Sequence, residues 1–322
     1  MSSTDPKTSA SKFTVGAAPH LRTSSSVSRL NHAYILALLP AGLLGAIFHA
    51  YGSKAVPMDA EVGPLPTVLQ VLVVELGVDT GLLWLFGILG TLALGFGAGA
   101  LFEYICQVLM RQPYRATDGH GALMGLLIAL LMPPTVPWWV LLFGVFTAIF
   151  LGKQIFGGIG GYPMHPAVVG WLILLLSWPQ YLYPVGMASI AAPHIASVIA
   201  TALGGIALCV LRVIPYQIPA GVIGGAIVAT LIFGHELSGN LGAQLFQGHL
   251  MLAAFFLGTD STSSPANLRA RWVFGAGLGF MVILIRAYGI WADAVPFAVL
   301  LMNALFPLID RLRPRARQVV TS

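Results

Sequence analysis

The first candidate ligand site is a glycine-rich segment, residues 157–166, which reads GGIGGYPMHP. Glycine has no Cβ, so its backbone can approach a ligand closely. Tyr162 and His165 add side chains that can hydrogen-bond. The same glycines would also suit a tight turn or close helix packing, and the sequence leaves both interpretations open. The candidate binding residues of this segment are Gly158, Gly160, Gly161, Tyr162 and His165.

Acidic residues stand beside two short apolar runs. Residues 246–258 are too few to cross a membrane as one straight helix, and Thr259 and Asp260 follow them directly. An ionisable group beside a helix break in a membrane is a functional candidate, and we assign Thr259, Asp260 and Asp118 to an ion path. The alternative for Asp260 and for Asp118, which precedes the run 120–132, is that each caps a helix or turn.

The histidines and cysteines do not indicate a metal or redox centre. His120, His165, His194, His235 and His249 are scattered without metal-ligand spacing, and the two cysteines, Cys106 and Cys209, form no CxxC motif. The chain also has no nucleophile–base constellation and no nucleotide loop. We therefore expect no metal site, and no catalysis by this chain alone.

The composition sets the class of protein that must position these residues. Of the 322 residues, 57% are hydrophobic and 8% are charged, whereas a soluble domain has about 25% charged residues. So few charges cannot form a water-facing surface, so we predict an all-α integral membrane protein. The net charge of +5 is spread over short loops, which argues against nucleic-acid binding.

Apolar runs divide the chain into about ten predicted transmembrane segments. Lys and Arg residues, among them Lys153, alternate across the loops so that both termini are expected to be cytoplasmic. The stretch 67–78 is interpreted as an interfacial helix on the outer side. The ten segments are 32–51, 82–109, 120–132, 137–152, 157–178, 194–212, 216–234, 246–258, 269–287 and 291–310.

The two halves of the chain resemble each other weakly but in order. HGALMGLLIALLMPP in the first half parallels GHLMLAAFFLGTDSTSSP in the second. Five segments per half is an odd number, so the second copy must be inverted, with a pair of broken helices at matching places. The alternative is ordinary tilted helices joined by proline-rich turns. The predicted division is a cytoplasmic arm (1–31), two five-helix repeats (32–178 and 194–310) and a basic cytoplasmic tail (311–322).

Five segments, in order, resemble the D subunit of Rnf electron-transport complexes and the related B subunit of sodium-pumping NADH:quinone reductase. They are PHLRTSSSVSRLNHAYILALLPAGLLGAIFHAYG, TDGHGALMGLLIALLMPPTVPWW, LGKQIFGGIGGYPMHPAVVG, FFLGTDSTSSP and VPFAVLLMNALFPLIDR. The resemblance implies a subunit of a bacterial inner-membrane complex that couples electron transfer between ferredoxin and NAD to cation translocation. It also implies partner subunits A, B, C, E and G.

The resemblance further implies a flavin, and this chain departs from the family there. Relatives commonly carry FMN esterified to a Thr on the outer side, but the corresponding loop 179–193 contains no Thr. Thr201 lies in the following apolar run, where we expect it to bond its own helix backbone. We therefore expect no covalent FMN, and a non-covalent flavin (riboflavin or FMN) at residues 157–166, with Tyr162 able to stack on the ring.

A second function from another class also fits the pattern. A ten-segment inverted repeat with two broken helices would equally suit a small-solute channel or transporter of the urea or ammonium type. Flavin absorption or co-purification with iron–sulfur partners would distinguish the two functions.

Overall fold

The computed structural model describes residues 27–52, 80–111, 118–133, 136–183, 195–237, 241–289 and 293–311. Every regular element in these ranges is a helix, as expected for an all-α protein. Most of the predicted cytoplasmic arm, the stretch 67–78, most of the loop 179–193 and nearly all of the basic tail lie outside the described residues.

Seven helical elements make up the first half of the chain. They are α1 (Val27–Gly52), α3 (Thr80–Leu109), α4 (His120–Leu131), α5 (Trp138–Phe150), the 3₁₀ turn η2 (Gln154–Phe156), α6 (Pro166–Ser177) and the short α7 (Pro179–Leu182).

The second half again consists of helices. They are α9 (Ile195–Val210), α10 (Gln217–Phe233), α11 (Leu241–Phe246), α12 (Leu250–Leu252), the π-helical turn η3 (Ala253–Leu257), α13 (Leu268–Tyr288) and α14 (Val295–Ile309). Within the described ranges, four stretches are long and apolar enough to cross a membrane, namely Val27–Phe48, Leu85–Leu109, Trp138–Phe156 and Leu268–Tyr288. The chain is therefore a helical membrane protein.

Two predicted segments differ from the helices observed. The expected run 157–178 begins as a loop, and α6 starts only at Pro166. The cause is local, because Gly157, Gly158 and Gly160 have φ angles of 93°, 92° and 96°, which other residues rarely adopt. The expected run 246–258 is one short α-helical turn followed by a π-helical turn, a geometry that often marks functional sites.

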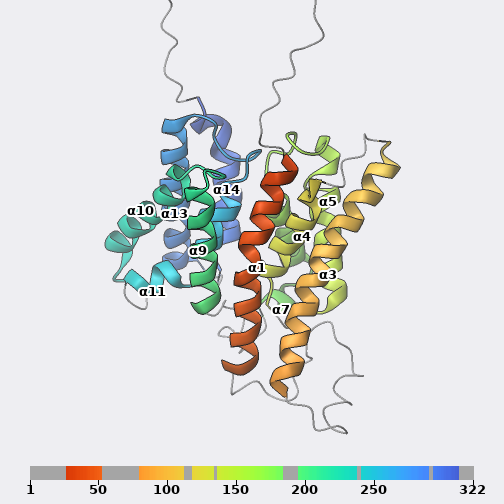
Figure 1. Cartoon of the computed structure of the whole chain (residues 1–322). Coiled ribbons are helices and arrows are strands. Elements are labelled where there is room, and N and C mark those ends of the chain that lie inside the picture. The colour runs from red at the N-terminus through yellow and green to blue at the C-terminus, as the bar shows by residue number, and fades with distance from the viewer. Residues whose placement is uncertain are drawn as a thin grey trace, which may run out of the picture.

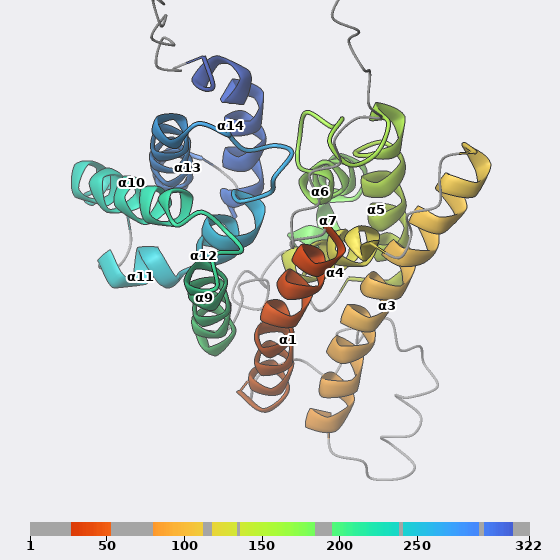
Figure 2. The same ribbon diagram turned by 45° about the horizontal axis from the view of Figure 1, so that its top comes forward.

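The helices form two groups joined at the centre of the molecule (Figures 1 and 2). Helices α3 to α6 lie on one side, and α10 to α14 lie on the other. Helices α1 and α9 pack side by side between the groups, and α6 also contacts α14. The start of α1 and the end of α14 lie at the same end of the molecule, drawn at the top of Figure 1.

Glycines allow α3 and α4 to pack backbone against backbone. Gly95 and Gly99 of α3 face Gly121 and Gly125 of α4. A Cβ on Gly99 would lie 2.0 Å from the Gly121 carbonyl oxygen, and a Cβ on Gly125 would lie 1.9 Å from that of Gly95. This is the small-residue packing typical of membrane helices. It brings Glu103, one turn beyond Gly99, against the start of α4.

Helices α10 and α13 cross in the same way in the second half. A Cβ on Gly225 would lie 2.0 Å from the Ala276 carbonyl oxygen, and one on Gly279 would lie 1.9 Å from that of Val222. Each half therefore contains a close glycine-lined crossing that fixes two helices relative to each other.

Candidate functional site

A buried ion pair stands at one end of the site. Lys153, just after α5, pairs with Glu103 of α3, and their side chains are 1% and 2% exposed. Gln107, one turn along α3, donates a 3.2 Å hydrogen bond to the same carboxylate. By sequence, Lys153 is expected to be a loop charge. The structure instead buries it, because an acidic partner reaches it from the neighbouring helix.

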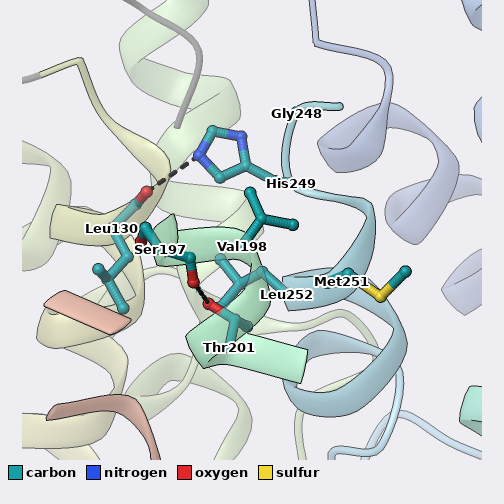
Figure 3. A pocket seen from close by; sticks show the side chains of 8 residues that line it. All are labelled: Leu130, Ser197, Val198, Thr201, Gly248, His249, Met251 and Leu252. Atoms are coloured by element: carbon teal, nitrogen blue, oxygen red, sulfur yellow. Dashed lines mark hydrogen bonds between the residues drawn. The ribbon is translucent and has the colours of Figure 1, made fainter. Parts of the chain in front are cut away.

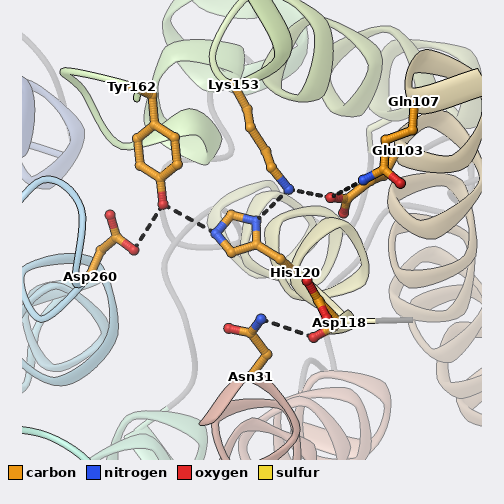
Figure 4. A network of polar contacts seen from close by, with 8 residues as sticks. All are labelled: Asn31, Glu103, Gln107, Asp118, His120, Lys153, Tyr162 and Asp260. Carbon is orange, nitrogen blue, oxygen red and sulfur yellow. Dashed lines mark hydrogen bonds and ion pairs between the residues drawn. The ribbon is translucent and has the colours of Figure 1, made fainter. Parts of the chain in front are cut away.

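From this pair a chain of hydrogen bonds crosses to the other half of the molecule (Figure 4). Lys153 Nζ donates to His120 Nδ1 at 3.1 Å, which leaves Nε2 of His120 to donate to the Tyr162 hydroxyl at 3.2 Å. The Tyr162 hydroxyl in turn donates to Asp260 Oδ1 at 3.1 Å. Each group in the chain therefore donates to the next, from the Lys153 ammonium in the first half to the Asp260 carboxylate in the second.

Asp260 has a structural role as well as its place in this chain. Its second oxygen accepts from the backbone N–H and the hydroxyl of Ser263, at 3.1 and 3.0 Å. It therefore holds the turn after the π-helical segment, as the capping interpretation expects, and it also accepts from Tyr162. Asp260 can therefore hold this turn and also belong to the polar chain that is the candidate ion path.

Helix α1 is tied to both halves beside this chain. Its Tyr34 hydroxyl lies 3.1 Å from Thr259 Oγ1, which donates to the Phe255 carbonyl at 2.6 Å. Its Asn31 amide donates to the backbone carbonyl of Asp118 at 2.9 Å. The N-cap residue of α4 is Gly119, so Asp118 lies one residue before the helix start.

A cavity of about 70 Å³ adjoins the chain. A polar cavity of this size has room for a few water molecules. His165 lines it, is fully buried, and neither of its ring nitrogens bonds to a described residue. The other polar lining residues are Asn31, Tyr34, His120, Asp260 and Ser261.

The glycine-rich loop, residues 157–166, forms a turn beside this cavity, and its Ile159 and His165 line it. The positive φ angles already require glycine at three positions, which supports the turn interpretation. A Cβ on Gly157 or Gly160 would meet nothing within 4 Å, so there is also room for a ligand outside the loop. Gly160 and Gly161 are not fully buried, Gly158 is buried, and the Tyr162 side chain is 2% exposed.

Thr201 is a helix residue in this structure. It lies in α9, is buried, and its hydroxyl donates to the Ser197 carbonyl at 2.8 Å. The same bond was expected from its place in an apolar run.

Three residues of the site, Glu103, His120 and Lys153, were not selected from the sequence. A signal for one was present, because Glu103 is the only acidic residue between residues 85 and 109 and an ionisable group inside a membrane segment is functional by default. His120 was set aside because it lacks metal-ligand spacing. Within the described part of the chain, no group of three or more His, Cys, Asp or Glu side chains is placed to hold a metal.

Comparison with known proteins gives one consistent result. The sequence model of the NQR2, RnfD, RnfE family matches residues 14–194 and 189–318. The chain is 33% identical to the D subunit of the ion-translocating oxidoreductase complex of Ectopseudomonas mendocina, over 77% of this chain and 90% of that protein. It is 28% identical to the D subunit of the proton-translocating ferredoxin:NAD(+) oxidoreductase complex of Clostridium ljungdahlii, over 93% and 94% of the two chains.

Replacing Lys153 tests the buried pair. We expect Lys153→Met to destabilise the purified chain by about 3–5 kcal/mol, because it leaves Glu103 as an uncompensated buried charge. The measurement is the thermal unfolding midpoint of the full chain in detergent, compared with that of the double variant Glu103→Gln, Lys153→Met. The double variant removes both charges, so it should recover most of the loss. A single variant that unfolds no earlier than the unsubstituted chain would contradict this account.

Proposed function

The chain belongs to the NQR2, RnfD, RnfE family, and from that membership we propose that it is the D-type membrane subunit of an Rnf-type complex. Such a complex couples electron transfer between ferredoxin and NAD to cation transport. The names of the relatives support this function over a small-solute channel. The structural observation that carries it is the hydrogen-bonded chain from Glu103 to Asp260, which links the two halves through buried ionisable groups.

The proposed architecture is ten membrane segments in two inverted five-segment repeats, with both termini cytoplasmic. Two packing contacts support it. Helix α1 packs on α9, and α6 packs on α14. In each pair the two helices would hold the same position in the two repeats, as packing around a two-fold axis would give. A short, broken helix also occurs in each half, α4 in the first and α12 with η3 in the second.

Reporter fusions test this topology. We expect fusions after Arg115 and after Glu236 to report opposite sides of the membrane, since an odd number of proposed segments separates them. The readout is the activity of a reporter that works on one side only. The same reading at both positions would exclude the ten-segment arrangement.

The ion path of this subunit is proposed to run along the cytoplasmic ends of the broken helices. Asp260 and Thr259 lie where η3 ends, and Asp118 lies just before α4. The adjoining cavity gives a few waters access to Asp260 and His120. Buried ionisable groups beside water in a membrane protein are typical of ion or proton pathways.

Asp260→Asn tests this role in the assembled complex. The amide keeps an oxygen that can accept from Tyr162 or Ser263 but removes the charge, so we expect ion transport to fall more than assembly does. Transport is measured in vesicles containing the complex, and assembly is measured by co-purification of partner subunits. Glu236→Gln is the control, because Glu236 is 47% exposed. Equal loss of transport and assembly would leave Asp260 with its turn-holding role alone.

Flavin binding is proposed at the glycine-rich loop and without a covalent bond. The accessible backbone of Gly160 and Gly161 offers groups that can bond to a flavin ring. Tyr162 and His165 lie directly beneath, so stacking by Tyr162 would require the loop to open. The partners proposed are subunits A, B, C, E and G of an Rnf-type assembly, together with membrane lipid, in a bacterial inner membrane.

Denaturing gel electrophoresis under ultraviolet light tests the absence of covalent flavin. We expect no fluorescent band at the 34.0 kDa position of this chain, because the Thr201 hydroxyl is buried and bonded within its helix. Another flavin-bearing subunit of the same complex serves as the positive control. A fluorescent band at this position that Thr201→Ala abolishes would contradict the proposal.

A further inference from the structure

A second buried polar cluster lies at the far end of α4 from His120. His249, which precedes α12, forms an ion pair through Nδ1 with Asp293, in the loop before α14. Its Nε2 lies 3.0 Å from the backbone carbonyl of Leu130, in the last turn of α4 (Figure 3). The His249 and Asp293 side chains are 8% and 15% exposed.

The partners of His249 determine its protonation. A carbonyl oxygen and a carboxylate can only accept hydrogen bonds, so both ring nitrogens must donate. His249 is therefore an imidazolium in this geometry. If it lost a proton, either the Leu130 carbonyl or the Asp293 carboxylate would lose its donor, and each is partly buried at the boundary between the two halves.

The surrounding groups favour the charged pair. The Val295 backbone N–H donates to Asp293 at 3.1 Å, and the Tyr183 hydroxyl donates to the Asp293 backbone carbonyl at 3.4 Å. Arg286 of α13 bonds to the Gln244 and Gln247 carbonyls nearby.

A small cavity connects His249 to the hydroxyl groups of α9. It measures about 20 Å³, which is room for one water molecule, and Ser197, Thr201 and His249 line it. Ser197 donates to the Ala41 carbonyl at 2.8 Å and Thr201 donates to the Ser197 carbonyl, so both hydroxyl oxygens still have lone pairs to bind water. A water bound there would be an acceptor for a proton that leaves His249.

His249 corresponds to His120 in the other half. Each histidine lies at the start of a short helix of its half. Each also contacts a residue in the loop before the last helix of that half: His120 contacts Tyr162, and His249 contacts Asp293. Each site also extends to the end of the broken helix in the opposite half. His249 bonds to Leu130, and His120 reaches Asp260 through Tyr162.

We propose that His249 and Asp293 form a second proton-binding site, on the outer side of the membrane, that is the counterpart of the His120 site. The inference rests on the proposed function, and it names the proton as the cation that this subunit handles. For release, one N–H breaks its hydrogen bond to the Leu130 carbonyl or to Asp293 and gives its proton to water entering the adjoining cavity, which leaves a neutral ring that still donates to the other acceptor. Uptake returns the proton to that nitrogen and restores the hydrogen bond. Sodium fits poorly here, because hard cations prefer oxygen ligands and the described groups facing the carboxylate are already N–H donors.

The first experiment uses the full complex reconstituted in vesicles. We expect His249→Gln and Asp293→Asn each to abolish the response of a pH-sensitive dye per electron transferred, because neither variant retains the histidine–carboxylate pair. His235→Gln is the matched control, since His235 is 68% exposed, and it should leave the dye response intact. Co-purification of partners shows that each variant assembles.

Two outcomes would overturn the proposal. One is that both variants move protons as the unsubstituted complex does. The other is that the unsubstituted complex acidifies or alkalinises vesicles only when sodium is present. A chain that joins no complex and moves no ion would instead overturn the proposed function.

A second experiment judges the site without any transport. Nitrogen NMR of the full chain with labelled histidine should show a doubly protonated ring at neutral pH. This signal should be missing from His249→Gln. A His249 ring that is neutral at neutral pH would also overturn the proposal.

Discussion

The structure depends on one constraint, which is that backbone polar groups inside a membrane must find hydrogen-bond partners within the protein. The broken helices violate this locally, because each leaves carbonyl groups at its end. Here the opposite half supplies the partners: His249 bonds to Leu130 at the end of α4, and Tyr34 lies 3.3 Å from the Thr259 carbonyl at the end of η3. The two halves are therefore joined by the groups that breaking the helices exposes.

Close glycine packing makes those bonds possible. Because Gly99 and Gly121 let α3 and α4 touch, Glu103 comes near enough to balance Lys153 in a buried pair. The pair in turn orients His120, since Lys153 donates to Nδ1 and thereby directs Nε2 to Tyr162. Helix packing, charge balance and histidine orientation are thus successive consequences of small residues on one helix face.

The sequence predicted the class of fold and part of the site. Composition alone indicated a helical membrane protein, and the break before Asp260 identified a residue that does lie in the polar chain. It did not identify Glu103, His120 or Lys153 as partners, because they are 17 to 50 positions apart and only the packing of α3, α4 and α5 brings them together. The sequence also did not predict that α6 starts only after the glycine loop. The apolar run 157–178 includes this loop, and apolar character does not reveal the positive φ angles that interrupt the helix there.

The two polar clusters differ in the hydrogen-bond pattern of their histidines and in the size of the adjoining cavities. At the His120 site the histidine accepts from Lys153 and is neutral in the hydrogen-bond pattern, and its cavity has room for a few waters. At the His249 site both ring nitrogens donate, and the cavity has room for one water. Because each histidine reaches toward the end of the other half's broken helix, a change of protonation at either site alters the contact between halves.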